Sequence, residues 1–387
     1  TGAPKGVQHT TAGYLLWTST THRYVFDLRE NDVYACVADC GWITGHSYIV
    51  YGPLCNGATT VIFESTPLYP DCGRYWDMVE RLKITQFYTA PTAIRAIAAA
   101  GEQWPQKYEM PSLRLLGTVG EPINPEAWRW YNTNVGKERC PIVDTWWQTE
   151  TGWSIAANCA GLGLLPIKEG SPSVAVPGWD LQVLDDNGRQ APAGEIGTLA
   201  AKLPLPPGTF PTLWNARQRH FDSYLKQFEG YYNTSDAGII DSDDYVFVMS
   251  RTDDIINVAG HRLSTGAMEE VLADHPAVAE CAVTGVADDL KGQVPMGFLV
   301  LSAGCEQADD EIVAEAVAMV RDRIGPVAAF KQALVVKRLP KTRSGKILRG
   351  TMRSIADGTP WKMPATIDDP VILDEIAQAL STIGYPR

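Results

Sequence analysis

The segment ITQFYTAPTAIRAIAAAGEQW (residues 84–104) indicates the fold class, because it places a strand directly before a helix. ITQFYTA is a short apolar run typical of a buried strand, and PTAIRAIAAAGEQW (91–104) has the apolar spacing of a helix. ATTVIFE (58–64) has the pattern of another strand, and PEAWRWYNTNVG (125–136) that of another helix. Strands that alternate with helices over residues 1–165 predict an α/β fold, in which ligands usually bind in loops at strand ends.

Residues 166–252 have a different pattern, which predicts a smaller β-rich subdomain. DLQVLDDNGRQAPAGEIGTLAAKL (180–203) holds two strand-like runs around an Asp-Asn-Gly turn, and YVFVMS (245–250) is a further strand. Residues 253–387 then predict a separate small α+β domain. Its clearest helix is DDEIVAEAVAMVRDRIGP (309–326), which has acidic residues at its start, basic residues near its end and a Gly-Pro stop. The other expected elements of this domain are a helix at 266–276 and strands at 279–286, 296–302 and 333–340.

The composition is that of an ordinary globular protein. The chain has 387 residues, of which 45% are hydrophobic and 20% charged, which is enough for two or three domains with their own cores. No apolar run approaches the length that spans a bilayer. The formal net charge of -12 argues against broad nucleic-acid binding, because phosphate backbones repel an acidic surface. The eight scattered cysteines show no zinc spacing and predict reduced thiols.

One basic segment stands out in this acidic chain. LPKTRSGKILR (339–349) holds four cations: Lys341, Arg343, Lys346 and Arg349. Three interpretations fit it: a solvated start of a helix, a nucleic-acid or nuclear-import patch, and a mobile loop that meets phosphates in an active site. The nucleic-acid interpretation is the weakest, because it needs a basic face and only one short segment supplies it.

Two further motifs have the residue types of a phosphate or nucleotide site. TGAPKG (1–6) combines a tight Gly-Pro loop with Lys5, which suits an anion. Taken alone, however, the motif fits a turn with a surface lysine better, and it does not match a Walker A loop. DTWWQTETGW (144–153) offers an aromatic surface for a purine or a small pocket, and Glu150 could hold Mg²⁺ against a phosphate. The alternative is a buried aromatic strand with an incidental glutamate.

Two polar segments lie near the start of the last domain. In YYNTSDAG (231–238), the Asp236 carboxylate could accept both ribose hydroxyls, or it could belong to an Asx-turn before a hairpin. In RTDDIINVAGHRLS (251–264), Arg251 and Arg262 are placed for phosphates or a ribose, and Asp253 lies where a hinge would be. The alternative for this second segment is a charged linker.

Taken together, these motifs closely resemble the short-chain acyl-CoA synthetases, the acetyl-CoA and propionyl-CoA synthetases of the AMP-forming, adenylate-forming superfamily. The strings that carry the resemblance, in the family's order, are TGAPKGVQHT, GWITGHSYIVYGP, YTAPTAIRA, GEPINPEAW, DTWWQTETG, RTDDIINVAGHR, LKGQVP and LPKTRSGKILR. The resemblance implies an incomplete AMP-binding N-terminal domain at 1–252, with an α/β part at 1–165 and a β-rich part at 166–252, followed by a small mobile C-terminal α+β domain at 253–387.

The resemblance also implies an activity. A carboxylate attacks the ATP α-phosphate with Mg²⁺, which gives an acyl-adenylate and pyrophosphate, and the CoA thiol then attacks the acyl carbon and expels AMP. ATP, Mg²⁺ and CoA are the expected cofactors. Lys346 corresponds to the adenylation lysine, whose ammonium would stabilise the charge that develops on the carboxylate and α-phosphate. Acetylating and deacetylating enzymes that act on Lys346 are further expected partners.

The remaining site residues are carried over from the family motifs. The resemblance implies that ATP or AMP is bound by Lys5, Gly120, Glu121, Pro122, Asp144, Thr145, Trp146, Trp147, Gln148, Thr149, Asp236, Arg251 and Arg262. The catalytic residues implied are Lys346, Glu150 (the Mg²⁺ ligand), Arg251 and Arg262. The acyl pocket implied consists of Ile43, Thr44, Val119 and Trp147, and the CoA contacts are Thr44, Leu68, Ala259, Gly260 and Arg321. Asp253 would be the hinge, and a structural cation would lie at Ala273, His275 and Val278, although a helix-capping role fits His275 better.

Several features leave the substrate open. Trp147 should close the pocket to long acids, but acetate and propionate differ by one methylene, which a pocket distinguishes by only about 1–3 kcal/mol. An acetoacetyl-CoA or aryl-CoA ligase and an inactive nucleotide-binding fragment are the alternatives.

The family's Tyr-Thr-Ser-Gly-Thr lead and much of its N-terminal domain are missing before Thr1, so we expect a truncated chain that is inactive alone. The expected compartment is the cytoplasm, or the mitochondrial matrix if the source is a eukaryote.

Overall fold

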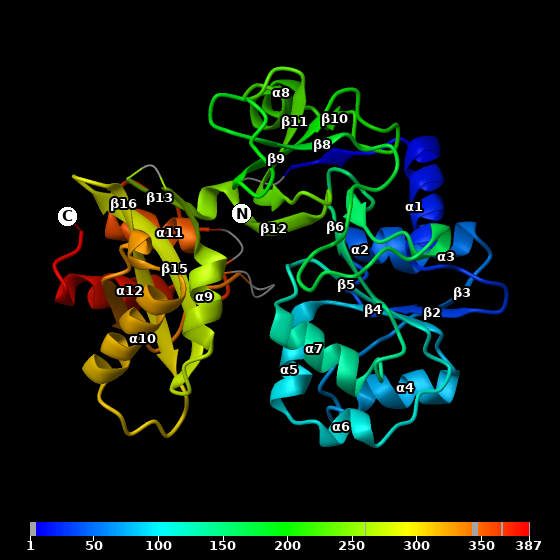
Figure 1. Cartoon of the computed structure of the whole chain (residues 1–387), viewed down its shortest axis with the longest axis horizontal. Coiled ribbons are helices and arrows are strands. Elements are labelled where there is room, and N and C mark those ends of the chain that lie inside the picture. Colours follow the sequence, from blue (N-terminus) through cyan, green and yellow to red (C-terminus); the bar gives the residue numbers. More distant parts are fainter. Residues whose placement is uncertain (1–4, 260, 343–346, 365–366, 387) are drawn as a thin grey trace. The chain divides into compact units, whose positions relative to one another are not determined.

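The computed structural model describes residues 5–259, 261–342, 347–364 and 367–386, and only the backbone of Asp253. The chain forms two compact units, which are treated separately (Figure 1). The larger unit comprises Lys5–Thr234 and Gly238–Val248. The smaller unit comprises Ser235–Ala237 and, from Met249 onwards, the described remainder of the chain.

A six-stranded sheet is the centre of the larger unit, with the strand order β3-β2-β4-β5-β6-β7. The first five strands in this order are mutually parallel, and β7 joins β6 antiparallel. The carboxyl ends of the parallel strands therefore share one edge, where ligands usually bind in such sheets. The bounds are β2 (Val33–Cys36), β3 (Thr59–Val61), β4 (Gln86–Thr89), β5 (Leu115–Val119), β6 (Ile142–Trp146) and β7 (Ala156–Ala157).

Both faces of this sheet are buried, because neighbouring residues of a strand point to opposite sides. Phe87 and Leu116 pack in one cluster with α4, α5 and α7, while Tyr88 and Leu115 pack in another with the end of α1 and with η1. The predicted α/β class follows from these apolar strands. The helices of this part are α1 (Thr11–Val25), α2 (Ile43–Gly45), the π-helix η1 (His46–Tyr51), α3 (Gly52–Cys55), α4 (Arg74–Leu82), α5 (Pro91–Ala99), α6 (Gln103–Gln106) and α7 (Pro125–Asn134).

The helix expected at 91–104 is interrupted, so this prediction was wrong in its length. Helix α5 ends at Ala99 and α6 begins at Gln103. Gly101 lies between them with a φ of 104°, a backbone conformation outside the helical region that glycine adopts without a Cβ clash.

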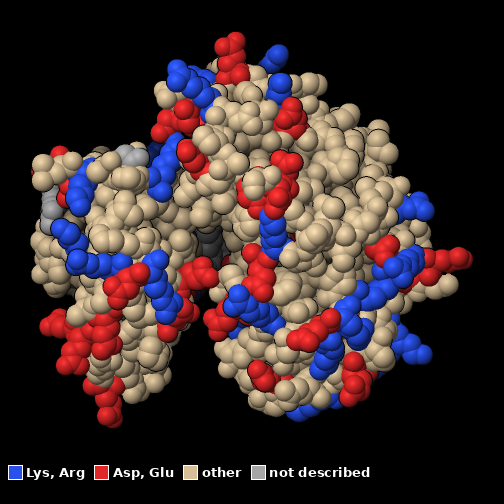
Figure 2. Space-filling view, in the orientation of Figure 1, with Lys and Arg blue, Asp and Glu red and all other residues tan. Residues whose placement is uncertain are grey.

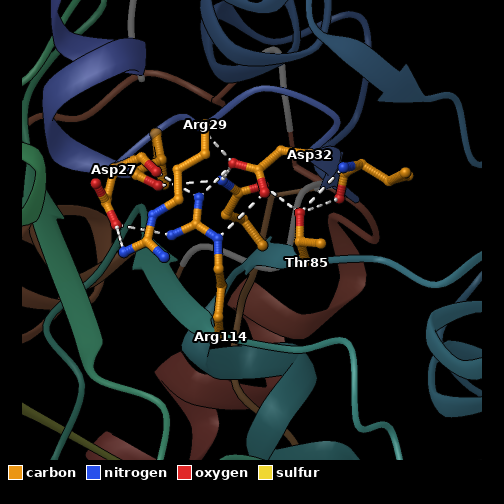
Figure 3. A network of polar contacts seen from close by, with 8 residues as sticks. Asp27, Arg29, Asp32, Thr85 and Arg114 are labelled. Atoms are coloured by element: carbon orange, nitrogen blue, oxygen red, sulfur yellow. Dashed lines mark hydrogen bonds and ion pairs between the residues drawn. The ribbon is translucent and has the colours of Figure 1, made fainter.

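Ion pairs hold the amino edge of the sheet, opposite the edge where the strands end (Figure 3). Arg114, just before β5, donates from Nη1 to Asp27 Oδ2 at 2.8 Å and from Nε to Asp32 Oδ1 at 3.1 Å. Gln86 Nε2 and the Arg29 backbone N–H donate to Asp32 Oδ2, each at 2.6 Å. Burial alone would raise the pKa of Asp32, but these hydrogen bonds and the Arg114 charge hold it below its usual value. The network ties the starts of β2, β4 and β5 together.

The β-rich part contains a four-stranded sheet with the order β12-β11-β9-β8. Its hairpin differs from the one expected around Asp-Asn-Gly. The turn is present, and Asp185 N–H donates to Arg189 O at 2.8 Å, but β8 pairs antiparallel with β9, which begins only at Gly197. The elements are β8 (Leu181–Leu184), β9 (Gly197–Lys202), β11 (Tyr231–Ile240), β12 (Val246–Arg251), the short pair β1 (Val7–Gln8) and β10 (Thr212–Leu213), and the helices η2 (Ala160–Leu162) and α8 (Arg217–Tyr224).

The smaller unit has its own sheet, ordered β14-β13-β16-β15, with β17 parallel to β16. One face packs on α9 and α10 through Val283 and Leu299, and the other packs on α11 and α12 through Ala282 and Phe298. The expected α+β character is therefore present. The bounds are η3 (Thr252–Asp254), β13 (Ile255–Val258), β14 (His261–Ser264), α9 (Thr265–Ala273), β15 (Val278–Asp288), β16 (Gly292–Leu301), α10 (Asp309–Arg323), η4 (Pro326–Ala328), β17 (Gln332–Val335), α11 (Arg349–Ala356) and α12 (Val371–Thr382).

The surface carries both kinds of charge. On the face drawn in Figure 2, basic and acidic side chains are interspersed. All eight cysteines are free thiols. Among the residues that the structure describes, no helix combines the length and the apolar character needed to cross a lipid bilayer.

Candidate active site

Lys5, Glu150 and Tyr224 form a compact polar cluster in the larger unit. Lys5 Nζ donates to Glu150 Oε1 at 3.0 Å and to the Tyr224 hydroxyl at 2.6 Å, and that hydroxyl donates to the same carboxylate oxygen at 2.5 Å. Lys5 precedes β1, Glu150 follows β6, and Tyr224 is the last residue of α8. The cluster therefore joins two of the predicted ligand-binding motifs, and Tyr224 is a member that sequence reasoning missed.

The Glu150 carboxylate is held in its charged form. Burial alone would raise its pKa, but the Tyr224 hydrogen bond and the Lys5 charge together hold the pKa below the usual value. The hydrogen bonds from Lys5 and Tyr224 both reach Oε1, and neither of these two side chains donates to Oε2. One carboxylate suits Mg²⁺, which prefers oxygen ligands and usually keeps waters and substrate phosphates around it. The described residues hold no cluster of three or more metal-ligating side chains.

The predicted Gly-Glu-Pro motif lies directly after β5. Gly120 has a φ of 97°, a conformation that favours glycine, and it turns the chain away from the strand. Glu121 accepts hydrogen bonds at Oε1 from the Thr92 backbone N–H and at Oε2 from Arg95 Nη2, each at 2.8 Å. Its carboxylate therefore meets the start of α5, where a negative charge is stabilised by the helix dipole. The motif thus follows β5 and is bonded to the start of α5.

Asp144 is a buried carboxyl group on the neighbouring strand β6. Its Oδ1 accepts hydrogen bonds from Thr118 Oγ1 at 2.7 Å and from the Thr145 backbone N–H at 3.0 Å. Burial raises its pKa to about 7, although both hydrogen bonds act in the opposite direction. At neutral pH this group can therefore either donate or accept a proton in a hydrogen bond.

The two tryptophans of the DTWWQTETGW motif differ in position. Trp146 is the last residue of β6 and Trp147 lies beyond the strand, and both side chains are half-buried, so the motif is not a fully buried aromatic strand. Trp147 Nε1 donates to the Tyr88 hydroxyl at 3.3 Å, and its ring meets the edge of Tyr48 at a centroid distance of 5.3 Å. The Tyr88 hydroxyl also contacts Thr145 Oγ1 at 2.5 Å. Tyr48 and Tyr88 therefore fix the indole.

Three of the predicted acyl-pocket residues are placed as follows. Val119, the last residue of β5, is buried in the same apolar cluster against which Trp147 packs. Ile43 and Thr44 belong to α2, which leads into η1 with Tyr48, and Thr44 is buried. The structure thus connects Val119 and Trp147 through one core, while the shared pocket with α2 stays a prediction.

The following residues of the motif are held by β11 and by the N-terminal segment. Gln148 Nε2 donates to Thr234 O at 2.7 Å, and the Tyr232 hydroxyl donates to Gln148 Oε1 at 2.8 Å. His9 Nε2 and Thr149 O form a hydrogen bond of 2.8 Å. Neither His9 nor Tyr232 was predicted, because their contacts with Gln148 and Thr149 join distant segments.

In the smaller unit, Asp236 and Arg251 form the predicted polar pair. Arg251 Nη1 lies 2.9 Å from Asp236 Oδ1. Arg262 lies in β14 opposite Asn257 of β13, so the segment that could have been a charged linker is a hairpin. Asp253 belongs to η3, and its side chain lies outside the described structure.

The predicted CoA contacts come from both units. Thr44 and Leu68 belong to the larger unit, whereas Ala259 and Arg321 belong to the smaller one. Ala259 has a φ of 50°, and Arg321 lies in the last turn of α10. Gly260 and Lys346, the predicted adenylation lysine, lie outside the described residues.

The structural cation predicted at Ala273, His275 and Val278 is not supported through the imidazole of His275. Its Nδ1 accepts a hydrogen bond from the Ala277 backbone N–H at 3.2 Å, and its Nε2 contacts Glu315 Oε2 at 2.9 Å. Both ring nitrogens are therefore engaged, in agreement with the capping interpretation.

A cavity of about 440 Å³ lies elsewhere, at the amino edge of the six-stranded sheet, and is lined by Arg23, Leu28, Arg29, Glu30, Asn31, Asp32, Asn56, Gly57, Ala58 and Thr59. None of these residues belongs to the predicted site. We place the candidate site at the cluster of Lys5, Glu150 and Tyr224, because its motifs and charges fit an anionic ligand.

Comparison with known families identifies the architecture. The AMP-binding enzyme family matches residues 1–212, and the AMP-binding enzyme C-terminal domain matches residues 267–346. The chain belongs to the AMP-binding enzyme family. The motif-based resemblance and the expected fold class, an AMP-binding domain followed by a C-terminal domain, are thereby confirmed.

Relatives of this AMP-binding enzyme are longer than the chain. An uncharacterised protein of Pseudomonas aeruginosa is 47% identical over 384 residues, which cover 98% of this chain and 60% of the relative. The acetyl-coenzyme A synthetase of Phycomyces blakesleeanus is 50% identical over 377 residues, 96% of this chain and 56% of the relative. The chain thus spans less than two thirds of the length of these relatives.

A solved structure has the same fold. The acetoacetyl-CoA synthetase from Streptomyces lividans superposes with a TM-score of 0.88 over 99% of this chain and 58% of that structure. Its sequence identity is 22%, so this likeness supports the fold alone.

Proposed function

We propose that the gene product carrying this chain is an AMP-forming ligase for a short carboxylate, acetate or propionate. It would convert the carboxylate and ATP to an acyl-adenylate and pyrophosphate, and then transfer the acyl group to the CoA thiol with release of AMP. The observation that carries the proposal is the cluster of Lys5, Glu150 and Tyr224 in an AMP-binding domain. The similarity to a protein named acetyl-coenzyme A synthetase supports the substrate class.

The cluster suits the adenylation step electrostatically. Mg²⁺, when bound, would neutralise phosphate charge, and Glu150 Oε2 is the oxygen that would hold it. Lys5 would attract the phosphates, since it already lies beside this carboxylate. Lys346 would stabilise the charge that develops at the α-phosphate and the attacking carboxylate.

The nucleotide and acyl subsites would adjoin the ends of β5 and β6. Gly120, Glu121 and Pro122 with residues 144–149 would form the adenine pocket, and Asp236 with Arg251 would hold the ribose. Trp147 would form the wall of the acyl pocket, because Tyr48 and Tyr88 fix its ring. A rigid indole at this place would admit a short acid and exclude a longer one. The C-terminal domain would supply Ala259, Gly260 and Arg321 for CoA, with Asp253 as the hinge.

The test is thioester formation by the gene product that carries this chain. Acetate, propionate, butyrate and acetoacetate would each be supplied with ATP, Mg²⁺ and CoA, and both AMP and the CoA thioester would be measured. We expect turnover with acetate or propionate to exceed that with the two larger acids. A protein that binds ATP but forms no thioester with any of them would contradict the proposal.

Lys346→Ala separates the two steps. This variant should lose adenylate formation, measured as carboxylate-dependent pyrophosphate exchange, but retain thioester formation from a supplied acyl-adenylate. Lys337→Ala is the matched control, because Lys337 is an exposed lysine nearby in the sequence that has no proposed role. Equal loss of both half-reactions in Lys346→Ala would refute the role of Lys346.

A further inference from the structure

The turn that carries Glu150 in the larger unit is closed by its own hydrogen bonds. The Thr151 and Gly152 backbone N–H groups both donate to Gln148 O, at 3.1 and 2.9 Å. Gly152 has a φ of 74°, a conformation that favours glycine. These bonds fix the shape of the turn, but contacts with other segments must set its place in the unit.

Carbonyl groups of this turn accept hydrogen bonds from two distant segments of the same unit. The Phe210 backbone N–H donates to Glu150 O at 3.0 Å. Ser47 of η1, which is fully buried, donates from Oγ to Gly152 O at 2.6 Å. The Ser47 bond comes from a side chain, so a substitution can remove it and leave the backbone of η1 unchanged.

Tyr14 of α1 supports this serine. Its hydroxyl oxygen lies 2.5 Å from Ser47 Oγ. The Ser47 proton is already used in the bond to Gly152 O, which can only accept, so the Tyr14 hydroxyl is the donor to Ser47 Oγ. Burial raises the pKa of Tyr14 to about 12, and the hydroxyl therefore keeps its proton at neutral pH.

The ring of Tyr14 also lies directly against the turn. A Cβ added at Gly152 would lie only 2.7 Å from Tyr14 Cε2, so the backbone approaches the ring as closely as glycine alone permits. The ring itself packs against Tyr51, with a centroid distance of 5.6 Å in an edge-to-face arrangement. Neither Tyr14 nor Ser47 was among the predicted site residues.

We propose that Ser47 and Tyr14 are positioning residues for adenylation, which act through the Gly152 carbonyl to hold Glu150 in place for Mg²⁺. The inference rests on the proposed function, in which Glu150 binds the Mg²⁺ of the adenylation step. A buried carbonyl that loses its donor is unfavourable, so the turn would shift to pair Gly152 O elsewhere. A shift of about 1 Å in a catalytic group can reduce a rate by about 100-fold.

The test uses Ser47→Ala and Tyr14→Phe in the full gene product. The first variant removes the donor to Gly152 O. The second keeps the aromatic ring and removes only the hydroxyl that donates to Ser47. Pyrophosphate exchange over a range of Mg²⁺ concentrations measures adenylation, and thioester formation from a supplied acyl-adenylate measures the second half-reaction.

Ser171→Ala and Tyr245→Phe are the matched controls. Both side chains are buried in the same unit and donate to backbone carbonyls, Ser171 Oγ to Val246 O and the Tyr245 hydroxyl to Pro166 O, each at 2.6 Å. None of these residues has a proposed role in the reaction. Each control should lower the melting temperature by a few degrees, about as much as the corresponding test variant, because each loses one buried hydrogen bond.

We expect Ser47→Ala to raise the Mg²⁺ concentration for half-maximal adenylation by about 5-fold or more, and to lower kcat at saturating Mg²⁺ by about 10-fold or more. Tyr14→Phe should change both in the same direction by about 3-fold, since Ser47 keeps its own bond but loses the donor that orients it. Thioester formation should stay within about 2-fold of wild type, as should every measurement on the controls. An unchanged Mg²⁺ dependence, or equal loss in both half-reactions, would overturn the inference.

Hydrogen exchange distinguishes failure of this inference from failure of the proposed function. The Thr151 and Gly152 amide protons exchange when the turn opens, which mass spectrometry of a peptide that spans 147–153 reports without any ligand. We expect exchange about 5-fold or more faster in Ser47→Ala than in wild type and Ser171→Ala. If wild type forms no adenylate, the proposed function fails but this measurement still tests the support of the turn, and equal exchange rates would overturn it.

Discussion

Lys5 Nζ lies 3.0 Å from Glu150 Oε1, although 145 positions separate the two residues in the sequence. The contact brings Lys5 and Glu150, from two separate predicted motifs, to one place, and Tyr224 bonds to both side chains. Because the carboxylate already has two donors on one oxygen, it is charged and oriented before any ligand arrives. This arrangement is the basis for the first prediction.

Glu150→Gln should reduce adenylation by about 100-fold or more, because a neutral amide cannot replace a carboxylate as a ligand of Mg²⁺. Pyrophosphate exchange measured over a range of Mg²⁺ concentrations is the assay. Lys168→Gln is a suitable control, since Lys168 pairs with carboxylates of the larger unit outside the proposed site. Wild-type exchange rates in Glu150→Gln would remove this residue from the metal site.

Tyr224→Phe should move the acid limb of the adenylation pH profile to higher pH. The Tyr224 hydrogen bond lowers the pKa of Glu150, so its loss raises that pKa and leaves the carboxylate protonated over a wider acid range. The rate at alkaline pH should change much less than the rate at acid pH. A uniform decrease at every pH would show that the hydroxyl has another role.

Trp147→Gly should shift the substrate preference from acetate and propionate towards butyrate and longer acids. Removing the indole opens the wall that Tyr48 and Tyr88 fix. The ratio of kcat/KM for butyrate to that for acetate should rise at least 10-fold, as a methylene in an apolar pocket is worth about 1–3 kcal/mol. An unchanged ratio would exclude Trp147 from the acyl pocket.

His22→Gln should reduce the loss of stability in acid. His22 is fully buried, and burial lowers its pKa to about 3. The unfolded chain binds a proton on this residue below its usual pKa of about 6.5, whereas the folded chain does not, so wild-type stability falls as pH decreases from 6.5 towards 3.

Gln has no such titration. Between pH 7 and pH 4.5 the free energy of unfolding of wild type should therefore decrease by about 3 kcal/mol more than that of the variant, measured by urea unfolding. Parallel pH dependences of the two proteins would show that His22 becomes protonated in the fold.

Most strands could be predicted from the sequence, because their apolar runs are local. The strand expected at 84–90 is β4 (Gln86–Thr89), and the helix expected at 125–136 is α7 (Pro125–Asn134). The break at Gly101 was missed, since apolar spacing continues across it and only the backbone angle shows the interruption.

Residues of the candidate site could be predicted only where they belong to a sequence motif. Lys5, Glu150 and Asp236 were predicted from their motifs, whereas Tyr48, Tyr88 and Tyr224, which contact predicted residues in the structure, were not. These tyrosines lie in ordinary helix and strand patterns, and their contacts depend on tertiary packing that no short window of sequence contains. Their hydroxyls orient the predicted residues. A motif therefore indicates the chemistry of the site, but not the residues that hold its side chains in position.

The way the sheet of the smaller unit is covered affects which gene segments can be exchanged by recombination. Its two apolar faces are covered by α9 and α10 on one side and by α11 and α12 on the other, all of them encoded by one continuous stretch of the gene. Recombination that exchanges this stretch between related genes would transfer a complete core. Natural chimaeras with joins just before β13 should therefore fold, and the two parts of such genes can accumulate substitutions at different rates.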